Sequence, residues 1–305
     1  DAMPGEVTVP ARKLMDICRQ LPDGAEVEFE LKEQRLVIKS GRFRSTLSTL
    51  PAQDFPSVEK TADEMNISVD SKALKSLLDK TGFAMAQQDV RFFLNGMLLE
   101  TGDGIIRAVA TDGHRLALNS LVVPGSKTSR QVILPRKGVV ELQRLLQEIK
   151  GDVDISIGSN HLGTTTEEFS LTTKLLDGKY PDYERVIPKG GNRTILADRE
   201  ELRQALSRTA ILSNEKFRAI RVSFSNGNMQ LSANNPEQEE AEETVSVDYQ
   251  GETLEIGFNV SYLQDVLGVL DSDKIKITVL DANSSAVIEE PGNEDSIYVV
   301  MPMKL

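Results

Sequence analysis

Residues 9–21 read VPARKLMDICRQL, and the same opening returns at residues 134–137 as LPRK. In both places a proline precedes basic residues, and apolar residues then recur at helical spacing. The first stretch predicts a helix at Ala11–Leu21. Similar patterns predict helices at Ser71–Met85, Pro135–Ile149, Asp198–Leu212 and Asn259–Leu270. The helix starts recur roughly every 60 residues, which is typical of an internal repeat.

Short alternating runs separate the predicted helices. Val27–Ser40, Gly96–Ala110 and Val153–Gly158 have the period of strands, and the pairs Asp103-Gly104 and Asn226-Gly227 are turn signals. Each unit is therefore predicted to be one helix followed by a small antiparallel meander. The fold class that follows is α+β.

Alternate units resemble each other more than neighbouring units do. The exit Leu50…Phe55-Pro56 recurs as Leu175…Tyr180-Pro181, and Leu74…Leu77-Leu78 recurs as Leu202…Ala205-Leu206. One helix over a meander exposes an apolar face, and pairing two units buries it, so two units make a domain of roughly 125 residues.

This count predicts domains at 63–190 and 191–305, with 1–62 as the second half of a first domain. We expect an N-terminal unit of about 60 residues to be absent, and a natural five-unit protein is the alternative. Because residues 1–62 would then lack half of their sheet, we also expect disorder before about residue 60.

The composition excludes several function classes. The chain has 305 residues, 35 Lys+Arg against 47 Asp+Glu and a net charge of −12, so binding of nucleic acid by bulk positive charge is excluded. It lacks an apolar run of ~20 residues and a signal-peptide pattern at its start, so we expect a cytoplasmic protein with no membrane contact. Cys18 is the single cysteine and is expected to be a buried small hydrophobe.

At this point the residues resemble a known family, the bacterial sliding clamp, which is the beta subunit of DNA polymerase III. The resemblance covers the whole chain in order. The matching stretches are VPARK (9–13), DVRFFLNGMLLE (89–100), ATDGHRLAL (110–118), PRKGV (135–139), LLDGKYPDYERVIP (175–188), ILSNEKFRAIR (211–221), SANNPEQEEAEE (232–243), IGFNVSYLQDVL (256–267) and the terminal VVMPMKL.

The resemblance implies clamp (processivity-fold) domains and a homodimeric ring around double-stranded DNA, bound without sequence preference. It implies a hydrophobic pocket for the alpha subunit of DNA polymerase III, the delta subunit of the clamp loader, and other polymerases and repair factors. Mapped by the resemblance, the pocket consists of Leu94, Thr111, Gly113, His114, Arg115, Leu116, Pro181, Arg185, Val186, Tyr262, Met301, Pro302, Met303 and Lys304.

Motifs for catalysis, cofactors or metals are not found in the sequence. It contains no GxxxxGK[ST], GxGxxG, HExxH or CxxC motif, and His114 and His161 are its only histidines. The TDGHR segment at 111–115 places an acid beside an imidazole, but a tight turn explains it equally well. An enzyme that uses this turn is one alternative hypothesis, and a repeat scaffold that binds apolar peptides without DNA is another.

Basic residues recur on one face of the predicted helices, which suggests a positive inner surface in an acidic chain. Solvated helix faces are the alternative. A loop before the strand at Gly96 adds a second candidate contact, in which Phe92 and Phe93 serve either DNA or the core. The predicted DNA-facing residues are Arg12, Arg19, Lys72, Lys75, Gln88, Arg91, Arg136, Lys137, Arg144 and Arg203.

Charges of opposite sign at the two ends of the chain suggest a dimer seam. Arg42 and Arg44 alternate along one strand, and an acidic run lies near residue 240. In the family, the first domain of one chain meets the third domain of the other. The resemblance then gives a seam made of Lys13, Ile17, Leu21, Arg42, Arg44, Ile211, Leu212, Glu237, Glu239, Glu240, Glu242 and Glu243.

Overall fold

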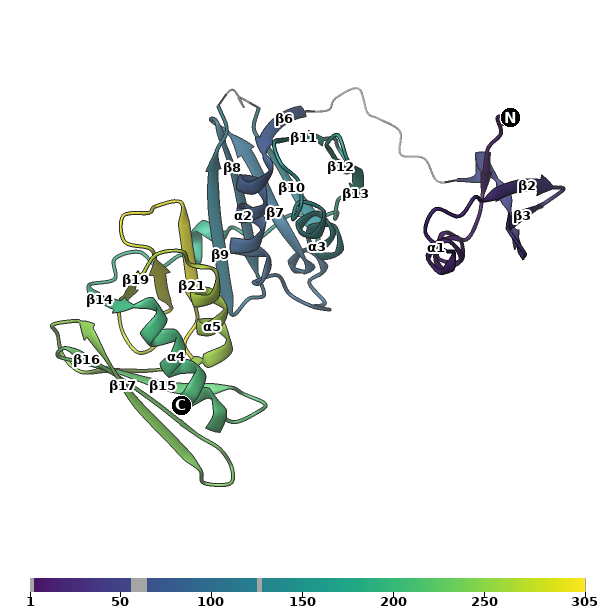
Figure 1. Cartoon of the computed structure of the whole chain (residues 1–305). Coiled ribbons are helices and arrows are strands. Elements are labelled where there is room, and N and C mark those ends of the chain that lie inside the picture. The colour runs from purple at the N-terminus through teal and green to yellow at the C-terminus, as the bar shows by residue number, and fades with distance from the viewer. Residues whose placement is uncertain (1–2, 56–64, 125–127, 305) are drawn as a thin grey trace. The chain divides into compact units, whose positions relative to one another are not determined.

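The structure is a computed structural model that describes residues 3–55, 65–124 and 128–304 (Figure 1). The chain divides into two compact units, Asp1–Lys60 and Thr61–Leu305. Pro56, the expected domain boundary at 62/63 and Leu305 lie outside the described residues.

Helices begin within one residue of every predicted start. They are α1 (Ala11–Gln20), α2 (Ser71–Gly82), α3 (Arg136–Leu145), α4 (Arg199–Thr209) and α5 (Val260–Val269). Asp70, Asp198 and Asn259 cap α2, α4 and α5, because each side chain accepts a hydrogen bond from a free N–H group of the first turn. Pro10 and Pro135 precede α1 and α3, where a missing N–H costs nothing.

The first unit contains two small sheets and one helix. Its strands are β1 (Val7–Thr8), β2 (Glu28–Lys32), β3 (Arg35–Ser40), β4 (Phe43–Ser48) and β5 (Leu50–Pro51), with the orders β1-β5 and β2-β3-β4. Its core contains Leu36, Ile38 and Leu47. The expectation of disorder before residue 60 is therefore wrong for residues 7–55. The prediction that Cys18 is buried is also wrong, because α1 buries no side chain fully and Cys18 is exposed.

The second unit holds two sheets. A four-stranded sheet has the order β13-β12-β11-β6, and a twelve-stranded sheet has the order β10-β7-β8-β9-β21-β20-β19-β14-β17-β16-β15-β18. Their strands are β6 (Met65–Asp70), β7 (Gly96–Gly102), β8 (Ile105–Thr111), β9 (Arg115–Val122), β10 (Arg130–Pro135), β11 (Asp152–Ile157), β12 (His161–Thr165), β13 (Ser170–Lys174), β14 (Arg193–Asp198), β15 (Ala219–Ser225), β16 (Asn228–Asn234), β17 (Glu240–Asp248), β18 (Leu254–Asn259), β19 (Lys274–Val279), β20 (Ala286–Glu289) and β21 (Ser296–Val300).

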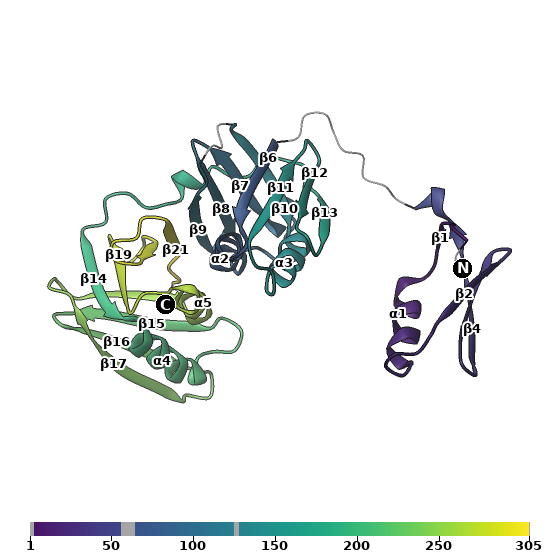
Figure 2. The ribbon, with the colours of Figure 1, turned by 45° about the horizontal axis from the view of Figure 1, so that its top comes forward.

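Paired repeats exchange the strand that leads into each helix. β6 precedes α2 but pairs with β11 of the next repeat, whereas β10 precedes α3 and pairs with β7 of the previous one. In the C-terminal pair of repeats, β14 precedes α4 and pairs with β19 of the next repeat, and β18 precedes α5 and pairs with β15 of the previous one. In each pair the two helices pack together on one side of the strands (Figure 2). The exchange fixes two repeats into one body, and the predicted α+β fold of paired helix-and-meander units is confirmed.

β9 and β21 join the central and C-terminal parts of the second unit into one continuous sheet. They pair antiparallel from Ser296 opposite Asn119 to Val300 opposite Arg115. The expected boundary at 190/191 falls between the short 3₁₀ helix η3 (Tyr183–Arg185) and β14. The boundary itself stays a prediction.

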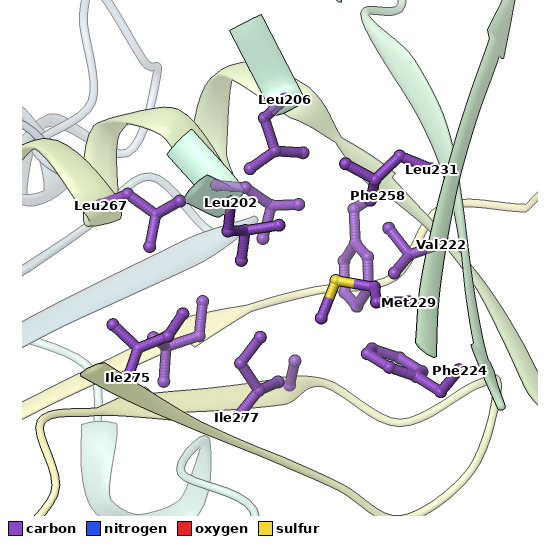
Figure 3. A pocket seen from close by; sticks show the side chains of 13 residues that line it. Leu202, Leu206, Val222, Phe224, Met229, Leu231, Phe258, Leu267, Ile275 and Ile277 are labelled. Carbon is purple, nitrogen blue, oxygen red and sulfur yellow. The ribbon is translucent and has the colours of Figure 1, made fainter. Parts of the chain in front are cut away.

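The core under α4 and α5 contains a small apolar cavity of about 20 Å³ (Figure 3). Leucines of α4 and α5 lie on one side of it, and Val222, Phe224 and Met229 of the sheet lie on another. A space of this size is on the order of one water molecule, and its lining offers a water no hydrogen-bond partner.

Candidate functional site

The TDGHR segment forms a tight turn between β8 and β9 that hydrogen-bonds to itself. The Asp112 carboxylate accepts hydrogen bonds from the N–H groups of His114 (2.9 Å) and Arg115 (3.1 Å). The Thr111 hydroxyl donates to the Arg115 carbonyl at 2.6 Å, and Gly113 has φ +89°. Asp112 thus holds the turn and is not paired with the His114 imidazole as a general base would be.

The C-terminal tail is attached to this turn and to the neighbouring sheet. The Met301 N–H donates to the His114 carbonyl at 2.9 Å, and the Met303 N–H donates to the Gly257 carbonyl at 2.7 Å. Met301 is 42% exposed. The tail therefore presents a flexible apolar side chain beside the turn, which suits recognition of varied apolar groups.

Beneath the tail lies an apolar floor. Leu94 and Leu116 are each 2% exposed and pack in one cluster with Tyr180, Tyr183 and Val299. The two leucines, predicted as pocket residues, are covered in this structure. They can meet a ligand only where the side chains above them move aside.

Two tyrosines tie the segment at residues 180–186 to this floor. The Tyr180 hydroxyl accepts a hydrogen bond from the Thr111 N–H at 3.1 Å. The Tyr183 hydroxyl accepts one from Arg107 at 3.1 Å and donates to Glu100, and burial together with Glu100 raises the pKa of Tyr183 to about 12. These contacts hold Pro181, Arg185 and Val186 exposed beside the turn.

Arg115 connects the turn to α5. Its side chain, 12% exposed, bonds Asp112 at 3.0 Å and the Phe83 carbonyl at 2.9 Å, and it contacts Asp265. Its guanidinium lies 4.6 Å from the centre of the Tyr262 ring. Arg115 therefore holds Tyr262 against the turn, and its contact with a ligand stays a prediction. Through these contacts the turn, the tail, the 180–186 segment and α5 come together.

The predicted DNA-facing cations lie on helices as expected, but carboxylates one turn away hold several of them. Arg144 bonds Glu141, Arg203 bonds Glu200, and Lys75 bonds Asp79. The hydrogen bonds from Arg203 and Gln204 lower the pKa of Glu200 to about 2. Arg136 donates to the Met85 carbonyl. The residues of this set that are exposed on the helices are Arg12, Arg19, Lys72, Lys137, Arg144 and Arg203.

Gln88 and Arg91 lie on a loop that contacts the turn. Arg91 bonds both carboxylate oxygens of Asp89, and this lowers the pKa of Asp89 to about 2. The Arg91 Nη2 atom lies 3.4 Å from the Asp112 carbonyl oxygen. Phe92 is 52% exposed and packs edge-on against Phe93.

Predicted seam residues are divided between the two units. In the first unit, Lys13, Arg42 and Arg44 are exposed, and Ile17 and Leu21 line a hollow with Phe43. In the second unit, Ile211 is 77% exposed beside Leu212. Among the predicted acidic residues Glu237, Glu239, Glu240 and Glu242 are exposed, while Glu243 bonds Arg208 of its own chain.

Sequence reasoning missed two side chains at the turn and one beside the tail. Tyr180 and Phe83 were read only as repeat and helix residues, and Phe217 was not selected although it is 55% exposed. Asn214 accepts hydrogen bonds from the N–H groups of Lys216 and Phe217, so an aromatic residue ends an asparagine-led turn. An aromatic in such a surface turn is the signal that could have found it.

Three family profiles match the chain in order. Those of the DNA polymerase III beta subunit match residues 1–59 (N-terminal domain), 68–182 (central domain) and 184–304 (C-terminal domain). The beta sliding clamps of Pseudomonas putida and Escherichia coli K12 are 57% and 48% identical over 305 and 302 residues. The chain belongs to the beta sliding clamp family. Its alignments with these two clamps cover 100% and 99% of the chain and 83% and 82% of the relatives.

Solved beta sliding clamps have the same fold. The crystal structure of the DNA polymerase III subunit beta from Pseudomonas aeruginosa superposes with a TM-score of 0.95 at 58% identity, covering 100% of this chain and 83% of that one. A second Pseudomonas aeruginosa clamp, bound to griselimycin, gives 0.93 at 57% identity and covers 100% and 83%. Because a profile of the N-terminal domain matches residues 1–59, these matches do not support the expectation that half of that domain is absent.

Membership of the beta sliding clamp family gives the chain a function. It is a sliding clamp, a non-catalytic processivity factor of DNA polymerase III, and the hypothesis of an enzyme at the turn is wrong. Within residues 3–55, 65–124 and 128–304, no helix is long and apolar enough to cross a membrane. The same described ranges contain no group of three or more His, Cys, Asp or Glu side chains arranged to hold a metal ion.

Proposed function

We propose that this clamp acts in the cytoplasm as a homodimeric ring around double-stranded DNA, built from domains at 1–62, 63–190 and 191–305. Its pocket would hold the alpha subunit of DNA polymerase III, the delta subunit of the clamp loader, and other polymerases and repair factors. Holding a polymerase on a ring raises its effective concentration at the primer end to the order of millimolar for a short tether. Processivity then needs no hydrolysis by the clamp.

The attachment of the tail to the turn is the main observation that supports a peptide-binding pocket at this place. Met301 and Val186, 42% and 46% exposed, lie on the tail and on the 180–186 segment, above the apolar floor. An extended peptide with three apolar anchors would gain ~1.5 to 3 kcal/mol for each anchor, less the free energy of ordering the peptide. Micromolar affinity follows, which suits a pocket that partners exchange.

A labelled peptide of the QLDLF type tests the pocket by fluorescence anisotropy. We expect saturation in the micromolar range and loss of binding in Met301→Ala and in Leu116→Ala. Val122→Ala is the matched control, because Val122 lies on the same strand as Leu116 and is 68% exposed. Absence of binding by the folded protein, or equal binding by all variants, would overturn the assignment.

The cations on the helices support weak, sequence-independent contacts with the phosphates of DNA. Contacts of this kind with phosphates have Kd values of ~10⁻⁴ to 10⁻⁶ M at physiological salt and permit sliding. Exposed Arg12, Arg19, Lys72 and Lys137 are the side chains best placed to make them. A closed ring would convert this weak contact into persistent attachment to DNA.

Two open strand edges support the seam. β4 is the last strand of its sheet, and β17 pairs with β14 only at Val247 and Asp248, which leaves its edge free at residues 240–246. The repeats make β17 equivalent to β9 and β4 equivalent to β21. Because β9 and β21 pair antiparallel within the chain, we propose that β17 and β4 pair in the same way between two copies.

The internal pairing also supplies a register for the seam. Ile297 lies opposite Leu118, and the equivalent residues are Arg44 and Glu242. The seam therefore places opposite charges directly across from one another, which fixes the register, although an exposed pair contributes only ~0 to 1 kcal/mol. Beside them, the exposed Ile211 would enter the hollow lined by Ile17, Leu21 and Phe43.

Charge exchange tests this register. We expect Arg44→Glu to weaken dimerisation and the double variant Arg44→Glu, Glu242→Arg to restore it, as measured by sedimentation equilibrium. Arg35→Glu is the control, because Arg35 is exposed at the other end of the β3–β4 pair. A double variant no better than the single one would refute this register.

A further inference from the structure

The methionines of the chain differ in how far solvent reaches them. Met85, Met97 and Met229 lie in the core and are at most 3% exposed. Among the described residues of the second unit, Met301 is the one exposed methionine, at 42%. Met15 on α1 of the first unit has nearly the same exposure, 43%. The described part of the second unit thus offers solvent one well-exposed thioether, and it lies beside the proposed partner pocket.

The backbone on both sides of Met301 is anchored. Val300 before it is the last residue of β21, and Pro302 after it has a fixed φ. The Met301 N–H itself donates to the His114 carbonyl at 2.9 Å. This anchoring keeps the Met301 sulfur beside the turn, where both solvent and a bound partner reach it.

A thioether that solvent reaches is open to oxidation by peroxides. The sulfur attacks one oxygen of hydrogen peroxide, the O–O bond breaks and an S–O bond forms, and the other oxygen leaves as water after proton transfer. Sulfur loses two electrons and the peroxide gains them. The product, methionine sulfoxide, is polar where the thioether was apolar, and methionine sulfoxide reductases reverse the change.

We infer that Met301 is a site of reversible oxidation by peroxides, and that its sulfoxide closes the pocket to partners. The inference rests on the proposed function, because a partner's apolar anchor would cover Met301 above the floor that contains Leu94 and Leu116. An apolar anchor offers the sulfoxide oxygen no hydrogen bond, so covering it would bury an unpaired acceptor. Partners are therefore released from an oxidised clamp, and a partner already bound shields the sulfur from the peroxide.

Peroxide treatment of the full chain tests the inference, in a Cys18→Ser background because Cys18 is also exposed. The labelled pocket peptide is titrated by fluorescence anisotropy before and after treatment, and mass spectrometry of a digest identifies the oxidised methionines. We expect Met301 and Met15 to oxidise before the buried methionines, and peptide affinity to fall about tenfold, as for a buried acceptor without a partner. Methionine sulfoxide reductase should restore the affinity. Saturating peptide should slow the oxidation of Met301 and leave that of Met15 unchanged.

Two leucine variants assign the effect to one sulfur. Met15→Leu should lose affinity on oxidation as the parent does. The affinity of Met301→Leu, compared with its own value before peroxide, should not change. Peroxide that weakens Met301→Leu as much as the parent, or an unchanged affinity of the parent after Met301 is fully oxidised, would overturn the inference. If the untreated parent does not bind the peptide, the proposed pocket fails instead.

Discussion

Cations on the helices differ in how freely they can meet a phosphate. Arg144 and Arg203 each share their guanidinium with a carboxylate three residues earlier, whereas Lys72 and Lys137 are exposed. A phosphate that binds the paired arginines must compete with Glu141 or Glu200. The exposed lysines therefore contribute more per residue to weak DNA contact, and the paired arginines mainly stabilise their own helices.

At the scale of single residues, the Tyr180 hydroxyl positions the pocket. It is the acceptor for the Thr111 N–H at the start of the turn, and Tyr180 is 7% exposed. Tyr180→Phe removes this acceptor, which costs about 1 kcal/mol and should weaken peptide binding about fivefold. Isothermal titration calorimetry with the pocket peptide measures this loss of affinity. Tyr249→Phe, which breaks a hydroxyl contact to Glu252 elsewhere, should bind as the parent does, and an unchanged Tyr180→Phe would argue against this role.

Individual residues also show where sequence reasoning stops. The i, i+3 partners of Arg144 and Arg203 are readable in the sequence, yet the prediction counted only the positive charges. Arg115 is a pocket residue by resemblance, and its contacts with Asp265, Tyr262 and the Phe83 carbonyl come from segments far apart in the chain. No local pattern reports such contacts.

Helix starts could be predicted because their signals are local. A capping Asp or Asn, or a proline, precedes each helix in the sequence itself. The exchange of β6 and β10 between repeats could not be predicted, since β6 pairs with residues more than 80 positions away and β10 with residues about 30 to 40 positions away. The meander of each unit could therefore be predicted from the sequence, whereas the pairing of the strand before each helix with another repeat could not.

Two elements are joined by a buried carboxylate near the end of β20. Glu290, 5% exposed, accepts hydrogen bonds from the N–H groups of Asp271 and Ser272 and lies 3.9 Å from Lys80 of α2. Burial raises the pKa of Glu290. The hydrogen bonds from Ser272, Asp271 and Asn293 lower it by more than burial raises it, so the net pKa lies below the ordinary 4.5. A lowered pKa means that this stabilisation is present above pH 4.5 and is lost as the pH falls below it.

Thermal unfolding at several pH values tests this carboxylate. We expect Glu290→Gln to be less stable than the parent at pH 7 by about 1.5 to 3 kcal/mol, as for hydrogen bonds to a charged group. The difference should shrink as the pH falls below 4.5, because the parent then also loses the charge. Glu167→Gln, at an exposed site, should follow the parent at every pH. A constant difference down to pH 3 would show that Glu290 does not titrate there.

The cavity under α4 and α5 offers a stabilising change within an element. Val222→Ile on β15 adds one methylene toward a space of about 20 Å³ lined by apolar side chains (Figure 3). We expect it to raise the free energy of unfolding by about 0.5 to 1 kcal/mol. Val245→Ile on β17 is the matched control, because Val245 is 1% exposed and does not line the cavity, so overpacking should lower stability. Urea denaturation measures both, and a loss of stability in Val222→Ile would mean that the cavity does not accept the added group.

For the whole molecule, antiparallel strand pairing joins each part to the next. Leading strands cross between repeats, β9 and β21 continue the sheet across the middle of the second unit, and β4 and β17 are left with open edges. An open edge invites another strand, and the open edges of β4 and β17 carry charges of opposite sign. The acidic composition excluded a uniformly basic protein but did not reveal how its charges are distributed over two edges.

Ring closure is the property of the whole molecule that depends on both edges. We expect two copies to associate through apolar contact at Ile211 and through register-setting charges, so Ile211→Asp should dissociate the dimer and high salt should weaken it only modestly. The same variant should leave closed circular DNA quickly, while Leu280→Asp, which alters an exposed leucine outside the seam, should remain as long as the parent. Light scattering gives the mass, and gel filtration of loaded circular DNA gives the retention. If neither salt nor Ile211→Asp changes the mass, the seam lies elsewhere; if retention is lost only after the DNA is cut, closure of the ring is what holds the clamp on it.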